Sequence, residues 1–198
     1  MMNRRTDHQR MFGGVNFDAV ELFAADIPAL QKFFDDNPDY FIAVTGAAPR
    51  SNEGFEEFHD QVPADMSFTK KWLLGFYDEA DNMIGMASVV SDLIAKNVWH
   101  VGLFVIATSL HGRGTARIIY DALEQWMCVS GATWIRLGVV DGNARAERFW
   151  EKCGYRDVRK RHGVEMGAKI NSLRVMVKSL GAESLDRYLA QVVRDRPE

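Results

Sequence analysis

The chain has 198 residues, of which 47% are hydrophobic and 26% are charged, a composition typical of one globular domain with a substantial core. The formal net charge of −3 at pH 7 argues against a protein that binds nucleic acid by neutralising many phosphates. The longest apolar run, residues 101–107, is too short to span a bilayer, and the polar N-terminus has no signal-peptide pattern. We therefore expect a cytoplasmic protein that binds neither nucleic acid nor a membrane.

The sequence predicts a single folded domain, because it contains no internal repeat and no low-complexity linker. We expect this domain to cover residues 15–181. Residues 1–14 are expected to form a loose arm, and residues 182–198 a C-terminal helix and tail. The two cysteines, Cys128 and Cys153, lack the spacing of a zinc site, so no metal is predicted.

The sequence predicts helices in the first seventy residues and strands together with helices after them. The first seventy residues favour helices over residues 26–36 and 52–61, the first with Pro28 in its opening turn. Two apolar segments, residues 72–77 and 83–90, are separated by a turn-rich stretch and predict an antiparallel hairpin. Further strands are expected over residues 98–106, 133–140, 155–161 and 174–180. Further helices are expected from Arg117 to Gly131, from Asn143 to Cys153 and over residues 182–194.

A glycine-containing turn links the expected central strand to an amphipathic helix. Residues 106–116 read IATSLHGRGTA, and apolar residues recur at helical spacing from Ile118 to Met127. Backbone N–H groups in such a turn bind anions with the help of the positive end of the helix. Gly112 and Gly114 let an anion approach the main chain closely. The sequence therefore predicts a phosphate site at this turn.

Two motifs resemble those of the GNAT superfamily of N-acetyltransferases. His111 to Ala116, HGRGTA, is similar to the family's cofactor loop Gln/Arg-x-x-Gly-x-Gly/Ala, with histidine at its first position. Asn143 to Tyr155 is similar to the family's Asn-x-x-Ala pattern, which an aromatic pair and Gly-Phe/Tyr follow. The resemblance covers residues 70–161 and implies an α+β fold. In that fold a mixed, mostly antiparallel central sheet is flanked by helices, and a parallel strand pair splays apart at the cofactor site.

The resemblance implies that the protein binds acetyl-CoA as a co-substrate. The backbone amides of residues 111–116 would hold the pyrophosphate, and Arg113 and Arg117 could reach the phosphates. The end of the preceding strand would hydrogen-bond the pantetheine arm, and Asn143 would meet this arm from the other side. The residues expected at the cofactor are Phe104, Val105, Ile106, His111, Gly112, Arg113, Gly114, Thr115, Ala116, Arg117, Asn143 and Trp150.

Trp150 departs from the family pattern, since many members carry at this position a tyrosine that protonates the leaving thiolate. An indole N–H donates a hydrogen bond but does not readily release its proton. Tyr155, Cys153 or a water could supply the proton instead. The thiolate could also leave unassisted, because thiols are far more acidic than alcohols. We therefore count Tyr155 among the expected catalytic residues and leave the general acid open.

His100 is the first candidate for the general base, which acetyl transfer to an amine requires. It lies on the expected central strand, eleven residues before His111. Histone acetyltransferases of the superfamily carry a glutamate at this position, and serotonin N-acetyltransferase a histidine. The alternative is a structural histidine that is hydrogen-bonded to a backbone carbonyl. Asp141 and Asp92 are weaker candidates for the base or for amine recognition.

Charge is unevenly distributed along the chain. Residues 21–65 hold ten acidic residues against Lys32 and Arg50, whereas residues 111–161 hold ten basic residues against six acidic ones. An acidic wall at the acceptor site would favour a cationic substrate. We therefore expect the acceptor to be a primary amine of a small molecule or a peptide. Exposed strands near the C-terminus could also form the contact of a homodimer.

Two other functions fit parts of the sequence. The chain could bind acetyl-CoA without catalysis, as a regulatory module, because the usual tyrosine is absent at Trp150. A dinucleotide oxidoreductase would also place Gly112 and Gly114 after a strand and Asp141 after the next one. In that fingerprint, however, Arg117 stands where the third glycine belongs. Stabilisation of the protein by NAD, and not by acetyl-CoA, would favour the oxidoreductase.

Overall fold

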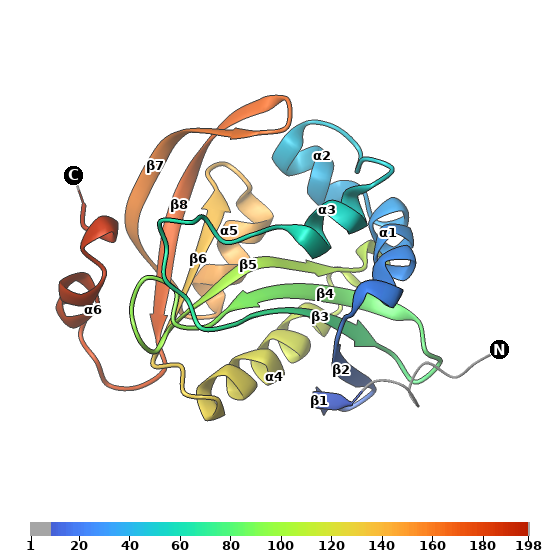
Figure 1. Cartoon of the computed structure of the whole chain (residues 1–198), viewed down its shortest axis with the longest axis horizontal. Coiled ribbons are helices and arrows are strands. Elements are labelled where there is room, and N and C mark those ends of the chain that lie inside the picture. Colours follow the sequence, from blue (N-terminus) through green and yellow to red (C-terminus); the bar gives the residue numbers. More distant parts are fainter. Residues whose placement is uncertain (1–8, 198) are drawn as a thin grey trace.

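The computed structural model describes residues 9–197, which form one eight-stranded sheet flanked by helices (Figure 1). The strands are β1 (Arg10–Gly14), β2 (Phe17–Glu21), β3 (Lys71–Tyr77), β4 (Met83–Val90), β5 (Val98–Ile106), β6 (Trp134–Val140), β7 (Arg156–Met166) and β8 (Lys169–Ser179). The helices are α1 (Ile27–Asp36), α2 (Asp39–Thr45), α3 (Glu53–His59), α4 (Thr115–Val129), α5 (Ala144–Lys152) and α6 (Leu185–Gln191). The strand order is β1-β2-β3-β4-β5-β6-β8-β7, and among these described strands only β5 and β6 pair in parallel. The predicted α+β fold with a mostly antiparallel sheet is confirmed.

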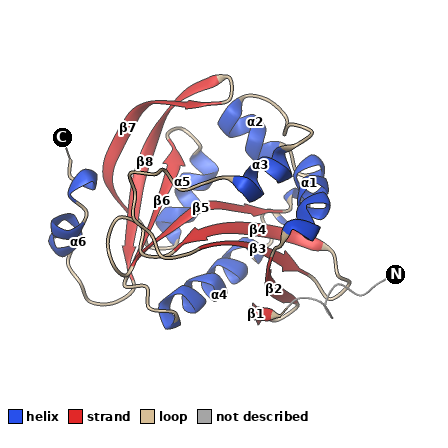
Figure 2. Cartoon of the chain, in the orientation of Figure 1, coloured by secondary structure: helices blue, strands red, loops and turns tan. Residues whose placement is uncertain are grey.

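Helices cover both faces of the sheet (Figure 2). On one face, Ile119 and Leu123 of α4 pack in a core with Val101 of β5. On the other face, Leu30 of α1 packs in a second core with Leu103 of β5. The apolar stripe of α4 is thus buried as its helical spacing predicts. Among the described helices, none is long and apolar enough to cross a membrane.

An extra residue in β5 reverses the direction in which its side chains point. Ser88 of β4 pairs with Leu103, but the next residue, Val89, pairs with Val101, so Gly102 forms a β-bulge. Side chains two residues apart in a regular strand point to the same face. Here Val101 belongs to the core beneath α4, whereas Leu103 belongs to the core beneath α1.

β5 and β6 run side by side and then separate. Their register ends where Val101 pairs with Leu137, although β5 continues to Ile106 and β6 to Val140. The predicted splay of a parallel strand pair is therefore present. Beyond this point the main chain of β5 has no partner on the β6 side among the described strands, so it is open to a ligand that adds to the strand.

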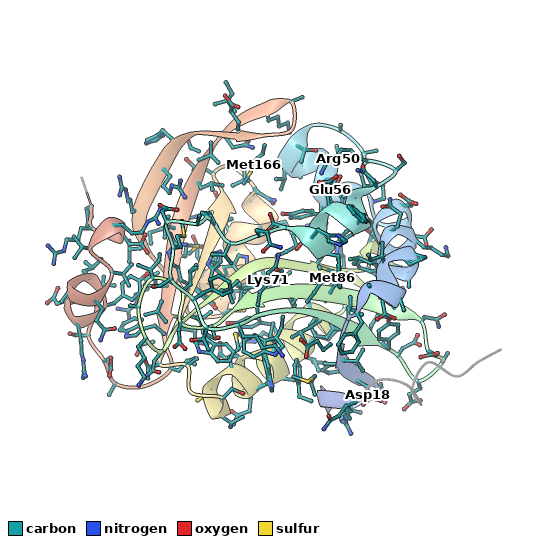
Figure 3. All side chains as sticks on the ribbon, viewed as in Figure 1. Asp18, Arg50, Glu56, Lys71, Met86 and Met166 are labelled. Carbon is teal, nitrogen blue, oxygen red and sulfur yellow. The ribbon has the colours of Figure 1, made fainter. Side chains whose placement is uncertain are left out.

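The β7–β8 hairpin is longer than the sequence predicts, and its tip contacts α2. Lys169 Nζ lies 3.0 Å from the carbonyl oxygen of Ala43, and Asn171 Nδ2 lies 2.9 Å from that of Val44. Lysine at a helix C-terminus also interacts favourably with the helix dipole. Met166, labelled in Figure 3, lies near this tip at the end of β7. The hairpin therefore covers one side of the region between α2 and the sheet.

The structure corrects the expectation of a loose arm over residues 1–14. Residues 10–14 form β1, which pairs with β2 across a turn in which Asn16 adopts a φ of 70°. Phe12 stacks on Trp126 of α4, with ring centroids 5.4 Å apart. Ladder pairing and burial of an aromatic ring hold this segment in place. Residues 1–8 of the expected arm lie outside the described residues.

Two helices differ from their expected extent. α2 follows Pro38 directly, where the sequence predicts only the end of the preceding helix. The helix expected over residues 182–194 is shorter, because α6 ends at Gln191 and is followed by a 3-10 turn over Val193–Asp195.

Candidate active site

The turn between β5 and α4 presents a row of free backbone donors. Gly112 and Gly114 adopt φ values of 76° and 81°, and a Cβ at either position would meet no atom within 4 Å. Among the hydrogen bonds of residues 9–197, none is donated by the backbone N–H groups of residues 112–116. These donors stand at the N-terminus of a 15-residue helix. The turn is therefore well suited to binding a diphosphate.

The two arginines that the sequence places near the phosphates differ in their contacts. Arg117 Nε lies 2.7 Å from the carboxylate of Asp121, and Arg117 Nη1 lies 2.8 Å from the carbonyl oxygen of Lys152. Both bonds are already made within the protein. Arg113 is exposed and has no hydrogen bond or ion pair to another described residue. Arg113 is thus the better placed of the two to meet a phosphate.

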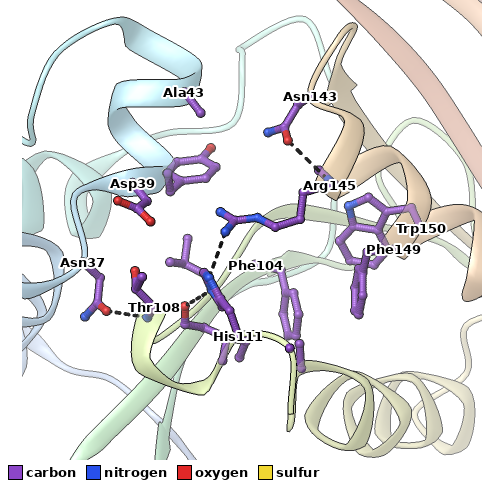
Figure 4. A pocket seen from close by; sticks show the side chains of 16 residues that line it. Asn37, Asp39, Ala43, Phe104, Thr108, His111, Asn143, Arg145, Phe149 and Trp150 are labelled. Carbon is purple, nitrogen blue, oxygen red and sulfur yellow. Dashed lines mark hydrogen bonds between the residues drawn. The ribbon is translucent and has the colours of Figure 1, made fainter. Parts of the chain in front are cut away.

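His111 connects the turn to α5 (Figure 4). Its Nε2 lies 2.9 Å from the carbonyl oxygen of Ile106, and its Nδ1 lies 2.9 Å from Nη1 of Arg145. Nε2 therefore donates to the carbonyl, and Nδ1 accepts from the guanidinium, which is the arrangement of a neutral imidazole. The Thr108 N–H donates to the side-chain oxygen of Asn37 at 2.7 Å and ties the turn to the end of α1.

A first pocket of about 220 Å³ extends from the glycine turn between β5 and α5 (Figure 4). Aromatic rings of Phe149 and Trp150 form part of its wall, and Asn37 and Asn143 supply polar groups. Such a mixture suits a slender ligand with an anionic end. Eight of the twelve residues expected at the cofactor line it, namely Phe104, Val105, Ile106, His111, Gly112, Ala116, Asn143 and Trp150. The other four, Arg113, Gly114, Thr115 and Arg117, lie along the adjoining turn and the first turn of α4.

A second pocket of about 270 Å³ occupies the gap between β5 and β6. Its lining includes His100 and Gly102 of β5 and Gly138 of β6. Asn143 and Trp150 line both this pocket and the first. A ligand arm that enters at the glycine turn can therefore end between the diverging strands.

His100 faces this second pocket as a neutral imidazole. Its Nδ1 lies 3.0 Å from the carbonyl oxygen of Arg136 and donates to it, which leaves Nε2 as an acceptor. Burial, followed by the positive charge of the Arg136 side chain, lowers the pKa of His100 to about 3. The imidazole can accept a hydrogen bond, but it takes up a whole proton only with difficulty. The backbone-bonded histidine that the sequence left as an alternative is therefore the environment observed.

Among the residues considered as general acid, Tyr155 and Cys153 line neither pocket. Tyr155 is buried with its hydroxyl 2.6 Å from that of Tyr120, and burial raises its pKa well above 10. Burial also raises the pKa of the Cys153 thiol to about 11. Trp150, in contrast, lines both pockets.

Asp141 and Asp92 take part in contacts that hold loops. Asp141 forms an ion pair with Lys160 at 3.0 Å. Asp92, with a φ of 53°, accepts hydrogen bonds from Thr69 Oγ1 at 2.7 Å and from the Asn97 N–H at 2.6 Å. These contacts account for both carboxylates without a catalytic role.

A third pocket of about 220 Å³ lies between α2, α3 and β4 and contains an acidic group of residues. Its lining includes Glu53, Glu57 and Asp60. Arg50 pairs with Glu53 at 2.8 Å, and Lys71 pairs with Asp60 at 3.1 Å. Glu57 has no ion pair with any residue in the part of the chain that the structure describes.

Glu57 is a functional candidate that the sequence did not single out. Burial raises its pKa to about 7, because the charged carboxylate loses water. The charges of Asp60 and Glu53 also raise this pKa, whereas Lys71 and the Ser88 hydroxyl lower it. In the sequence, Glu53 and Glu57 are one helical turn apart, but this spacing does not tell a pocket from a solvated helix face.

The fold and these pockets define an acyltransferase of the N-acetyltransferase class. A family model described as the acetyltransferase (GNAT) family matches residues 30–155. The chain belongs to the GNAT acetyltransferase family. The mostly antiparallel sheet also excludes the doubly wound sheet of a dinucleotide oxidoreductase.

Solved structures of acetyltransferases share this fold. An acetyltransferase from Thermus thermophilus has a TM-score of 0.66 and 20% identity, over 83% of this chain and 97% of that chain. The spermidine N-acetyltransferase from Vibrio cholerae, in complex with CoA and spermine, has a TM-score of 0.61 and 19% identity, over 84% and 96%. An aminoglycoside acetyltransferase in complex with coenzyme A has a TM-score of 0.62 and 16% identity, over 83% and 95%. No relative was found by sequence among proteins of curated function.

Proposed function

We propose that the protein transfers the acetyl group of acetyl-CoA to a primary amine of a small molecule or a peptide, by direct attack of the amine on the thioester. The observation that carries this proposal is the row of free N–H groups over residues 112–116, from which a pocket leads into the gap between β5 and β6. Neighbours of the same fold, solved with coenzyme A, act on spermidine and on aminoglycosides.

In this proposal acetyl-CoA binds through the residues expected from the sequence. The N–H groups of residues 112–116 and the side chain of Arg113 hold the diphosphate. The main chain of Phe104 to Ile106, on the side that faces away from β4, and the side chain of Asn143 hold the pantetheine arm. When bound, acetyl-CoA supplies an activated acetyl group in the second pocket, where Trp150 offers an indole N–H as a hydrogen-bond donor.

His100 takes part in the proposal as a neutral group beside the reacting atoms. Its Nε2 is free to accept a hydrogen bond from the amine, which would orient the nitrogen lone pair. Because the pKa of His100 is about 3, its imidazole does not retain a proton at neutral pH. Tyr155 is held against Tyr120 and supports the core behind Trp150.

Calorimetry with acetyl-CoA tests the binding site directly. We expect binding by the wild type and a loss of at least about tenfold in affinity for Gly114→Ala, because a strained φ disturbs the phosphate turn. Gly131→Ala is the matched control, since Gly131 lies just beyond the other end of α4 with a φ of 106° and equally open surroundings. Absence of wild-type binding, or equal affinity of both variants, would contradict the proposed site.

A screen of amines separates the enzyme from a silent binding module. The release of free thiol from acetyl-CoA is measured with alkyl diamines, aminoglycosides, amino acids and peptide N-termini. Acetylation of a primary amine supports the transferase. Tight acetyl-CoA binding without acetylation across these classes supports the module.

A further inference from the structure

We propose that Glu57 of α3 accepts the proton of a cationic acceptor amine, which enters through the acidic pocket between α2, α3 and β4. This inference rests on the acetyl transfer proposed above and assigns the acceptor side of the same site. It places the general base on a different element from His100.

The acidic pocket and the gap between β5 and β6 meet at one point of β5. Gly102 and Leu103 line both pockets, and so does Tyr40 of α2. A Cβ built on Gly102 would lie 3.8 Å from both Ser88 Oγ and His100 Cδ2. The missing side chain at the bulge therefore leaves free space where the two pockets join. An amine arriving from one pocket and a thioester arriving from the other would come together over Gly102.

The charges of the acidic pocket favour a cation. Glu53 and Asp60 each have one basic partner, Arg50 and Lys71, whereas Glu57 has no ion pair within the described residues. A carboxylate that is partly removed from water and has no ion-pair partner gains from an ammonium group at hydrogen-bond distance. The substrate class that this pocket fits is an aliphatic primary amine, positively charged at neutral pH.

The proton affinity of Glu57 suits a general base at neutral pH. Burial raises its pKa to about 7, in the range where a side chain both accepts and releases a proton readily. The charged or titratable groups around it are Glu53 of α3, Asp60 after α3, Lys71 of β3 and Tyr40 of α2. The ammonium of the substrate adds a positive charge, which keeps Glu57 ionised until the proton is transferred.

The proton and bond changes balance without a further reactant. The carboxylate of Glu57 accepts one proton from the ammonium, and the nitrogen lone pair forms the N–C bond while the C–S bond breaks. A second proton leaves the nitrogen and is taken up by the thiolate sulfur. The proton on Glu57 then returns to solvent, which restores the carboxylate.

The test compares Glu57→Gln with Glu56→Gln on the same helix. Glu56, labelled in Figure 3, is an exposed residue. Its carboxylate accepts a hydrogen bond from Asn52 Nδ2 at 2.8 Å. With 1,4-diaminobutane between pH 5.5 and 8.5, we expect wild-type kcat/KM to rise through about pH 7 and then level off. Glu57→Gln should lower it by at least about 100-fold and remove this rise, while Glu56→Gln behaves as wild type.

A second measurement does not depend on turnover. In wild-type protein carrying ¹³C-labelled glutamate, NMR should show one carboxyl group that titrates near pH 7 and is absent from Glu57→Gln. Acetyl-CoA affinity should be unchanged in both variants.

The outcomes separate this inference from the proposed function. Failure of the wild type to bind acetyl-CoA overturns the proposed function itself. Normal binding together with wild-type kinetics in Glu57→Gln overturns the role of Glu57, and so does normal binding without acetylation of any cationic amine. If Glu57→Gln does not fold, the absence of a carboxyl that titrates near pH 7 in the wild type still overturns it.

Discussion

Burial shifts the pKa values of His100 and Glu57 in opposite directions, because it disfavours whichever form is charged. The pKa of His100 falls to about 3 and that of Glu57 rises to about 7. At neutral pH the histidine is thus uncharged, and the glutamate is close to its midpoint. Of the two, only Glu57 changes its protonation within the ordinary working range of an enzyme.

The low pKa of His100 predicts a loss of stability in acid. Between about pH 3 and 6.5 the unfolded chain binds a proton at this histidine that the folded protein does not, so stability falls as pH falls below 6.5. Replacing His100 by Gln removes this effect. Urea titration at pH 7.5 and at pH 5 measures the free energy of unfolding of both proteins. The difference between variant and wild type should shift by about 2 kcal/mol in favour of the variant at pH 5. His59→Gln, at an exposed position, is the control, and an equal change in both variants contradicts the prediction.

Glu57 should affect stability in the opposite sense. Its pKa is raised from 4.5 to about 7, so the folded protein binds more protons than the unfolded chain in this window, and stability falls as pH rises through it. At pH 8, Glu57→Gln should therefore be more stable than wild type, by up to about 3 kcal/mol. At pH 4 the difference should largely disappear. Thermal unfolding of both proteins at the two pH values measures this, and a constant difference would contradict the raised pKa.

The bulge in β5 gives a test at the scale of one element. Gly102→Ala places a methyl group at ordinary contact distance from Ser88 and His100, so we expect the fold and the acetyl-CoA affinity to be unchanged. The methyl group fills the space where the two pockets join. We therefore expect kcat/KM for the amine to fall about 10- to 100-fold, because the reacting atoms are displaced. Gly181→Ala, with no atom within 4 Å, is the control, and equal kinetics in both variants would contradict this role of Gly102.

Elements with a strong local pattern could be predicted from the sequence, and those held by distant contacts could not. The strands β3, β4 and β5 are nearly continuous apolar runs of seven, eight and nine residues, and α4 has apolar residues at helical spacing. β1 and β2 have five residues each and depend on pairing with β3 and on α4. α2 has seven residues and follows Pro38, a residue that predicts the end of a helix when only the local sequence is considered.

The same distinction applies to the site. The phosphate turn could be predicted because its glycines and the helix that follows are contiguous in the sequence. The protonation of His100 depends on Arg136, which is 36 residues away. The environment of Glu57 depends on Lys71 and Ser88, on two neighbouring strands of the sheet. The position of a candidate base could therefore be predicted, but its proton affinity required the packed structure.

At the scale of the whole molecule, the C-terminal segment is bound to the centre of the sheet by a buried ion pair. Arg136 of β6 contacts both carboxylate oxygens of Asp195, at 2.7 and 3.0 Å, and the Tyr188 hydroxyl donates to the same carboxylate at 2.6 Å. Removing one partner of such a pair leaves a buried charge without compensation. Because the backbone carbonyl of Arg136 also binds His100, the end of the chain supports the site indirectly.

Asp195→Asn tests this support. We expect a loss of about 3 to 5 kcal/mol in free energy of unfolding, since Arg136 would keep its charge within the protein. Asp186→Asn, an exposed position on α6, should change it by less than about 0.5 kcal/mol. Denaturant titration of the two variants measures the difference, and a similar small effect in both would show that the ion pair contributes little.

The odd residue in β5 makes this strand sensitive to length as well as to composition. Removing Gly102 would restore simple alternation and leave Val101 facing the α4 layer and Leu103 facing the α1 layer, as they do now. Removing Phe104 instead would turn the later side chains of the strand to the opposite layer, so Val105, which now lies beneath α1, would press against α4. A single-codon deletion at Gly102 should therefore be far less damaging to the packing than the same deletion at Phe104.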